Sequence, residues 1–141
     1  MVWGTPLERF WQKVHKRDEL SCWLWTGGKK AAGYGQFWVD GHKVIAHRFS
    51  YAEFVGPIPD GFEVDHTCRN RSCVNPSHLE AVSLAENRQR RNAAKTDCVN
   101  GHEYTAENTM YQQGRDGYAS RVCRTCSRAS SARAYAVRRV R

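Results

Sequence analysis

The sequence predicts an α+β protein: a small zinc-stabilised core with an N-terminal helix and antiparallel strands, followed by a second zinc-binding module. Helix-like and strand-like segments alternate along the first 94 residues, and the six cysteines fall into two groups that each include a histidine at ligand spacing. At Lys95 the composition shifts towards Cys, His, Gly, Ser and Arg. A chain of 141 residues allows one main core and an appendage. We therefore expect a domain over residues 1–94 and a basic C-terminal module over residues 95–141.

The first two helices are expected over residues 6–17 and 46–55. Thr5 and Glu8 have the spacing of a capping box, and Pro6 takes the first helical position. The apolar residues that follow recur at helical spacing: Leu7, Phe10, Trp11 and Val14. In the second segment apolar residues again share one face, and Gly56-Pro57 ends it.

Between these helices, three segments rich in aromatic and β-branched residues predict strands, at residues 21–25, 34–39 and 43–45. Asp40-Gly41, between the last two, is a strong signal for a two-residue hairpin. We expect the three strands to form one antiparallel meander, with Trp25 and Trp38 facing the core.

Residues 62–94 predict a strand, a loop, a strand and a helix in that order. Residues 62–65 and 79–83 have the composition of short strands, and residues 85–94 that of a helix whose later positions are basic or polar. The side chains that could perform chemistry lie in the loop and at its borders: Asp65, His66, Cys68, Cys73, Asn75 and His78. This segment is therefore the candidate site.

The excess positive charge lies in the C-terminal part of the chain. Lys and Arg number 22 against 14 Asp and Glu, which gives a formal net charge of +8. Residues 1–87 hold ten basic and ten acidic side chains, whereas residues 88–141 hold twelve and four. Clustered basic side chains gain affinity for nucleic acids by displacing counterions from phosphates, so a nucleic acid is the expected partner. A solubilising tail or a tail that binds an anionic membrane is the alternative.

Both Cys/His groups have the spacing of zinc ligands. Cys68, Cys73 and His78 supply three ligands within eleven residues, and structural zinc requires a fourth. Cys22 is the best candidate, because it is the only other cysteine in the part of the chain without net charge. The four residues of the second group, which is similar to a zinc ribbon or knuckle, are Cys98, His102, Cys123 and Cys126. The number of cysteines leaves three disulfides open as an alternative.

Several stretches of the sequence together form a larger motif. They are Asp65-His66, Cys68, Cys73, Asn75-Pro76-Ser77-His78-Leu79 and Glu86-Asn87, with Cys22-Trp23-Leu24-Trp25-Thr26-Gly27, Gly33-Tyr34-Gly35 and Ala46-His47-Arg48 upstream. This set resembles the HNH, or ββα-metal, nucleases, and especially their phage and homing-endonuclease members. The resemblance covers roughly residues 6–92. The Cys, Cys, His loop after the first His also resembles the His-Cys box homing endonucleases.

The resemblance implies roles for the matching residues. His66 matches the general base that activates the attacking water, and its other ring nitrogen requires a partner, usually a carbonyl, that the sequence does not identify. Asn87 matches the helical amide that binds the catalytic divalent ion, and Asp65 matches a carboxylate ligand of the same ion. In many members the residue in the place of His78 orients the base or binds the catalytic metal. Here we expect His78 to bind zinc, as in the His-Cys box pattern.

Three other polar positions have expected roles. Arg48 is a candidate clamp for the scissile phosphate, because a planar guanidinium binds two phosphate oxygens; pairing with Glu53 on the same helix is an equal alternative. His42 and His47 are expected to be structural or surface residues. Asn75 is expected to satisfy backbone groups in the zinc loop.

Together these features predict a DNA endonuclease that hydrolyses phosphodiester bonds with a His general base and one divalent cation, Mg²⁺ or Mn²⁺, in addition to two structural Zn²⁺. Nicking and double-strand cutting both fit, and double-strand cutting would favour a homodimer. A homing enzyme and a packaging or nicking accessory of a phage would share these features. The alternative function is a non-catalytic zinc-dependent nucleic-acid-binding module.

The sequence predicts no membrane segment. The longest unbroken apolar run is Cys22-Trp23-Leu24-Trp25, and the first twenty residues contain no apolar stretch typical of a signal peptide. We therefore expect a cytoplasmic protein without a membrane partner, in the bacterial host cell if a phage encodes it.

Overall fold

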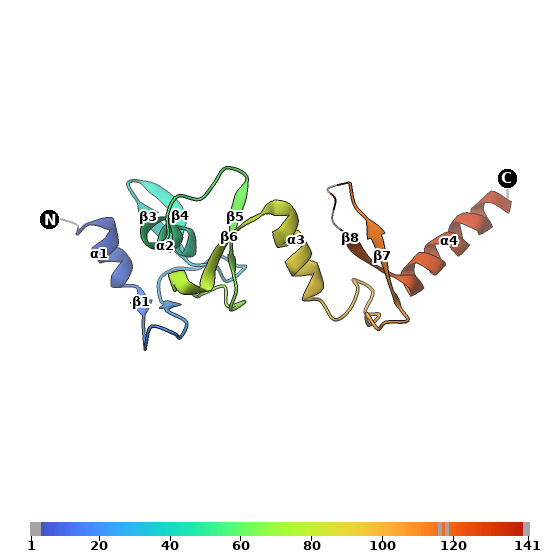
Figure 1. The fold of residues 1–141 in the computed structure, drawn as a ribbon, viewed down its shortest axis with the longest axis horizontal. Coiled ribbons are helices and arrows are strands. Elements are labelled where there is room, and N and C mark those ends of the chain that lie inside the picture. The colour runs from blue at the N-terminus through green and yellow to red at the C-terminus, as the bar shows by residue number, and fades with distance from the viewer. Residues whose placement is uncertain (1–3, 116, 118, 140–141) are drawn as a thin grey trace. The chain divides into compact units, whose positions relative to one another are not determined.

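The structure is a computed structural model that describes residues 4–115, 117 and 119–139 (Figure 1). The chain folds as two compact units, Met1–Leu84 and Ala85–Arg141. The predicted domain boundary between residues 94 and 95 lies one helix further along the chain and stays a prediction.

Helix α1 (Pro6–Trp11) begins as predicted but ends early. The Thr5 hydroxyl accepts a hydrogen bond from the backbone N–H of Glu8 at 3.2 Å, and the Glu8 carboxylate accepts one from the N–H of Thr5 at 2.7 Å. The expected end at residue 17 is wrong. Val14 and His15 form strand β1 (Val14–His15), which pairs with β2 (Leu24–Trp25), so backbone pairing replaces the last helical turn.

Strands β3 (Gln36–Val39) and β4 (His42–Ile45) form the predicted hairpin. Its turn residues Asp40 and Gly41 both have positive φ, 47° and 81°, as a type I′ turn requires. β4 leads directly into helix α2 (Ala46–Phe54).

The expected three-stranded meander is wrong. β2 pairs with β1 and β3 pairs with β4, in separate two-stranded ladders. The reason is that the loop over residues 67–78, which carries Cys68, Cys73 and His78 and is called the zinc loop here, occupies the other edge of β2. The N–H of Trp25 donates to the carbonyl of Ser72 at 2.8 Å, and Leu24 and Cys73 form an antiparallel bridge.

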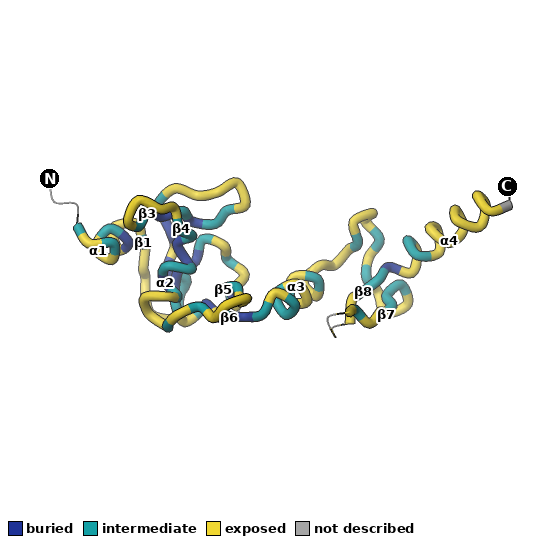
Figure 2. Tube along the Cα trace, turned by 90° about the horizontal axis from the view of Figure 1, so that it is seen from above, coloured by how far each residue is buried: buried dark blue, intermediate teal, exposed yellow. Residues whose placement is uncertain are grey.

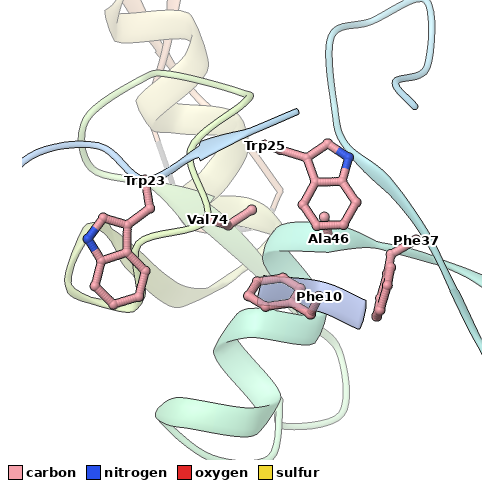
Figure 3. Packing of buried hydrophobic residues seen from close by; sticks show 6 residues of the cluster. All are labelled: Phe10, Trp23, Trp25, Phe37, Ala46 and Val74. Carbon is pink, nitrogen blue, oxygen red and sulfur yellow. The ribbon is translucent and has the colours of Figure 1, made fainter. Parts of the chain in front are cut away.

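The core of the first unit is largely aromatic, and Figure 3 shows Phe10, Trp25, Ala46 and Phe37 grouped together, with Val74 and Trp23 to one side. Trp25 is only 1% exposed and packs against backbone at Gly35. A Cβ at Gly35 would lie 2.6 Å from the Trp25 ring, so the close approach requires glycine. The cluster consists of Phe10, Trp23, Trp25, Phe37, Ala46 and Val74.

Trp25 lies in the core as predicted, but the same prediction for Trp38 is wrong. Trp38 is 53% exposed, because Phe37 takes the inward position on β3 and the pleat turns the next side chain outward. The ammonium of Lys43 lies 5.2 Å from the Trp38 ring centroid, which partly covers this face.

Strand β5 (Phe62–His66) pairs with β6 (Leu79–Ser83) in antiparallel register, with Asp65 opposite Glu80 and His66 opposite Leu79. The loop between them ends in a short 3₁₀ turn, η1 (Pro76–His78), and helix α3 (Leu84–Ala93) follows β6 directly. The predicted order of strand, loop, strand and helix is confirmed.

The second unit continues with elements that the sequence did not predict. Strands β7 (Thr109–Gln113) and β8 (Ala119–Cys123) form an antiparallel hairpin, and helix α4 (Arg124–Arg139) follows. Figure 2 shows that most of α4 beyond its first turns is exposed. The α+β class, with short antiparallel strand pairs and two Cys/His clusters, is confirmed.

Candidate active site

The first Cys/His group converges as the sequence predicts. Cys68, Cys73 and His78 of the β5–β6 loop meet Cys22, and their four ligand atoms lie within 4.8 Å of one another. Nδ1 of His78 lies 3.7 Å from Sγ of Cys22 and 3.5 Å from Sγ of Cys73. With Zn–S bonds of about 2.3 Å and Zn–N bonds of about 2.0 Å, a tetrahedral site has N···S edges of about 3.6 Å. This donor set could hold a four-coordinate zinc ion.

Hydrogen bonds hold this loop in place around the ligands. Nε2 of His78 lies 3.1 Å from the carbonyl oxygen of Leu20, so it donates there and leaves Nδ1 for a metal. The fully buried Asn75 donates from its amide to the carbonyls of Glu19 (3.0 Å) and Ser21 (2.7 Å). Its Oδ1 also accepts from the backbone N–H of Ser77 at 3.0 Å, so the predicted role of Asn75, satisfying backbone groups in the loop, is confirmed.

The second Cys/His group converges in the same way. Its members are Cys98, His102, Cys123 and Cys126, whose ligand atoms also lie within 4.8 Å of one another. Nδ1 of His102 lies 3.5 Å from Sγ of Cys98 and 3.3 Å from Sγ of Cys126, and these two sulfurs are 3.7 Å apart. A tetrahedral zinc site has S···S edges of about 3.8 Å. All six cysteines are free, so the structure does not contain the disulfides of the alternative hypothesis.

His66, at the end of β5, is only 6% exposed and its ring is fixed by the zinc loop. Nε2 lies 3.0 Å from the carbonyl oxygen of Cys73. A carbonyl can only accept, so Nε2 carries the hydrogen and the lone pair is on Nδ1. The backbone N–H of His66 donates to Oδ1 of Asp65 at 2.8 Å. The carbonyl partner that the sequence could not identify therefore belongs to a predicted zinc ligand.

The surroundings of His66 keep its imidazole neutral. Burial lowers its pKa below the ordinary 6.5, and the nearby Arg71 lowers it further. The hydrogen bond to Cys73 and the charge of Asp65 act in the opposite direction without reversing the shift. A neutral imidazole at physiological pH is the form that can accept a proton.

Three residues that the sequence did not assign to the site lie beside His66. The ring centroid of His47 is 4.4 Å from that of His66, and the ring of Tyr34 is 5.5 Å from His47 and 6.1 Å from His66. The Arg71 guanidinium lies 5.5 Å from the Tyr34 ring centroid and donates to the carbonyl of Ala32 at 2.9 Å. His47 and Tyr34 stand in stretches that resemble the family, but no local pattern places them against His66.

His47 is 5% exposed and its Nδ1 has no hydrogen-bond partner among the described residues. Burial lowers its pKa to about 3, and His66 acts in the same direction, while a hydrogen bond to the backbone of Val64 opposes the shift. In the unfolded chain this imidazole binds its proton with an ordinary pKa of 6.5. The free energy of unfolding therefore decreases as the pH falls below about 6.5, by up to about 1.4 kcal/mol per pH unit.

We expect the ring signals of His47 in an NMR spectrum of the intact protein to stay unchanged between pH 7.5 and pH 5, since the imidazole stays neutral. The His47→Gln variant, in which those signals are missing, assigns them. A His47 signal that titrates near pH 6.5 would contradict this prediction.

The other predicted catalytic residues lie on separate elements. Asp65 is half-buried beside His66 on β5, and Arg48 is half-buried on α2, where it makes no ion pair with Glu53 in the described part of the chain. Asn87 lies in the first half of α3, in the second unit. The structure thus brings Asp65 next to His66, and the roles of Asp65, Arg48 and Asn87 stay predictions.

A histidine at the end of one strand, a loop that carries a Cys/His cluster, a return strand and a helix are features of the ββα-metal class of nuclease. The family described as HNH endonuclease matches residues 44–89, which include α2, β5, β6 and the start of α3. One relative, Protein 2.8 of Escherichia phage T7, is 34% identical over 110 residues, which is 70% of this chain and 70% of that protein. This chain belongs to the HNH endonuclease family.

Two further phage proteins are similar to this chain. Protein 7.7 of Escherichia phage T7 is 44% identical over 66 residues, 47% of this chain and 51% of that protein. The uncharacterized gene 5.3 protein of Enterobacteria phage T3 is 34% identical over 68 residues, 48% of this chain and 61% of that protein. The chain thus spans about half and about three fifths of these relatives. No solved structure matches it.

No helix in the described ranges combines the length and apolar character that a membrane crossing requires.

Proposed function

We propose that this protein is a metal-dependent DNA endonuclease in which His66 is the general base and one divalent cation, Mg²⁺ or Mn²⁺, assists the reaction. The observation that carries the proposal is the fixed orientation of His66, whose Nε2–H donates to the Cys73 carbonyl while Nδ1 keeps its lone pair. Because the Cys73 carbonyl satisfies the N–H of the ring, the lone pair of Nδ1 is available to accept a proton from water.

The proposed chemistry follows from what hydrolysis of a phosphodiester requires. Water must attack phosphorus in line with the departing oxygen, and the charge that builds on the phosphate must be stabilised. His66 Nδ1 takes the proton from the water as its oxygen bonds to phosphorus. The bond to the 3′ oxygen then breaks, and the departing oxygen takes a proton from solvent. A bound divalent cation supplies Lewis-acid stabilisation of the phosphate and of the departing oxygen.

We assign the cation to Asp65 and Asn87, a carboxylate and an amide that both offer the hard oxygen ligands Mg²⁺ prefers. Asp65 precedes His66 on β5. Helix α3 begins at Leu84, directly after β6, so Asn87 follows the strand paired with β5 by about one helical turn. Chain order therefore supports this pairing of ligands.

Two arginines of the first unit are suited to hold the scissile phosphate. Arg71 is exposed and affects the pKa of His66, so its charge lies close to the base. Arg48 follows His47 on α2, and His47 contacts His66. A guanidinium can bind two phosphate oxygens at once. We propose that both contribute to binding and orienting the substrate.

We further propose that the protein acts inside the bacterial host cell, as its phage relatives suggest. Each chain has one His66 and would therefore hydrolyse one strand each time it binds DNA. A monomer would nick DNA, and a homodimer could cut both strands.

Incubating the full chain with supercoiled plasmid tests the proposal. The wild type should relax or linearise the plasmid with Mg²⁺ or Mn²⁺ and not without a divalent cation. Asn87→Ala should raise the Mg²⁺ concentration needed for half-maximal cleavage by about tenfold or more, because metal sites lose about 10–100-fold affinity even when outer partners are removed.

The matched control is Gln112→Ala, which removes an exposed amide from β7 and should leave the Mg²⁺ dependence unchanged. Wild-type Mg²⁺ dependence in Asn87→Ala would refute the ligand assignment. If no divalent cation supports cleavage by the wild type, the non-catalytic nucleic-acid-binding module is the better function.

A further inference from the structure

The second unit contains a groove that the proposed reaction does not use. It lies between α3 and the β7–β8 hairpin and has a volume of about 620 Å³. Its polar and aromatic lining includes Arg88, Gln89 and Asn92 from α3 and Tyr111, Arg115 and Arg121 from the hairpin side. All of these residues belong to the same compact unit.

Arg121 joins the two walls of the groove. From β8, its guanidinium donates to the backbone carbonyls of Asn92 (2.5 Å) and Lys95 (2.6 Å), at and just after the end of α3. The same guanidinium lies 4.0 Å from the Tyr104 ring centroid. A cation at the carbonyl end of a helix is well placed electrostatically. Arg121 therefore holds the hairpin wall of the groove against the wall formed by α3.

The lining has the chemistry of a phosphate-binding surface. Arg88 on α3 and Arg115 after β7 are exposed, and no Asp or Glu lies among the described residues that line the groove. Tyr111 is 72% exposed, which gives a bare aromatic face next to these cations. Arginine together with an exposed aromatic ring suits a nucleic-acid strand, in which anionic phosphates alternate with sugars and flat bases.

We propose that this groove binds one strand of DNA through its phosphodiester backbone, with Arg88 and Arg115 contacting phosphates and Tyr111 packing against an exposed base. The inference rests on the proposed function, because the groove would hold the DNA that His66 of the first unit cleaves. The groove uses three of the twelve basic side chains of residues 88–141: Arg88, Arg115 and Arg121. Binding of this kind does not depend on sequence.

The groove can be altered without touching the second Cys/His cluster. None of the four ligands of that cluster lines the groove, so substitutions in the groove should leave its metal content intact. Arg121 is excluded from the test because its hydrogen bonds hold the walls together. The informative variants are Arg88→Gln with Arg115→Gln, and separately Tyr111→Ala.

The experiment measures DNA binding by fluorescence anisotropy, with the full chain in a His66→Ala background and no divalent cation. The probes are labelled duplex and single-stranded oligonucleotides at several salt concentrations. The control is Arg133→Gln with Arg138→Gln, an equal loss of charge on exposed positions of α4. Zinc content by elemental analysis confirms that each variant is folded.

The double groove variant should weaken duplex binding at least about tenfold more than the control. Loss of two phosphate contacts should also reduce the slope of log K against log salt by about 1.8, at about 0.9 per phosphate. Tyr111→Ala should weaken single-strand binding by about fivefold or more, since stacking of one base contributes about 1–3 kcal/mol. Equal losses in the groove and control variants, or an unchanged affinity in Tyr111→Ala, would overturn the inference.

Cleavage assays of the wild-type chain with Mg²⁺ or Mn²⁺, together with the binding data, separate this inference from the proposed function. A wild-type chain that binds DNA through the groove but never cleaves with Mg²⁺ or Mn²⁺ would refute the nuclease proposal and retain the groove. If the wild-type chain cleaves DNA and the groove variants bind DNA as the control does, the proposed role of the groove is refuted and the nuclease proposal is retained.

Discussion

His66→Ala is expected to lower the rate of magnesium-dependent DNA cleavage by about 10²–10⁴-fold, the usual contribution of general acid–base catalysis, while DNA affinity stays unchanged. The reason is geometric. Nε2–H of His66 donates to the Cys73 carbonyl, which leaves the lone pair of Nδ1 free to accept a proton. Single-turnover cleavage of a labelled duplex measures the rate, and anisotropy measures the affinity.

A second variant separates loss of the base from loss of the loop structure. His66→Gln can still donate an N–H to the Cys73 carbonyl, but an amide cannot accept the proton of the attacking water. It should therefore be as inactive as His66→Ala. His42→Ala, which alters an exposed histidine on β4, should cleave at the wild-type rate. Wild-type cleavage by His66→Gln would show that another group is the base.

Cys22→Ser is expected to leave one zinc ion per chain in place of two and to abolish both cleavage and cooperative unfolding of the first unit. A structural zinc ion contributes about 10–16 kcal/mol in zinc-finger peptides, which is as large as the whole stability of an ordinary domain, about 5–15 kcal/mol. Cys22 ties the segment before β2 to the β5–β6 loop. Elemental analysis and denaturant unfolding measure the two effects.

Cys126→Ser serves as the comparison, because it removes one ligand of the second group and leaves the first group intact. This variant should also bind one zinc ion in place of two, but its first unit should stay folded. Two zinc ions and wild-type cleavage in Cys22→Ser would show that the first group does not depend on this ligand.

The two predictions are linked through Cys73. Its side chain belongs to the first metal-binding group, and its backbone carbonyl orients His66. Loss of zinc would therefore remove the hydrogen bond that sets the tautomer of the base, even without a direct contact between zinc and substrate. We therefore expect loss of the zinc ion from the first group to slow DNA cleavage.

The local parts of the site could be predicted from the sequence because their spacing is short. Cys68, Cys73 and His78 lie within one loop, and the paired strands that border it carry their own composition signal. Cys22 was identified by elimination and does reach the same cluster across about 50 residues. The strand, loop, strand and helix order followed from the same local patterns.

Other features depended on long-range packing that no local pattern reports. The early end of α1 and the split meander result from backbone pairing of β1 with β2 and of β2 with the zinc loop. His47 lies against His66 because α2 packs on β5, and a single sequence carries no sign of that contact. The hairpin and α4 of the second unit were not predicted from the sequence.

The sequence by itself determined the chemistry that is available: two sets of soft metal ligands, a histidine at the end of a strand and a basic C-terminal part. Only the tertiary structure decided the orientation of the histidine, its burial beside His47 and Tyr34, and the groove between α3 and the β7–β8 hairpin. Residue types and short spacings are local properties of a chain. A tautomer, a buried contact and the walls of a groove depend on atoms that are distant in sequence and meet only after folding.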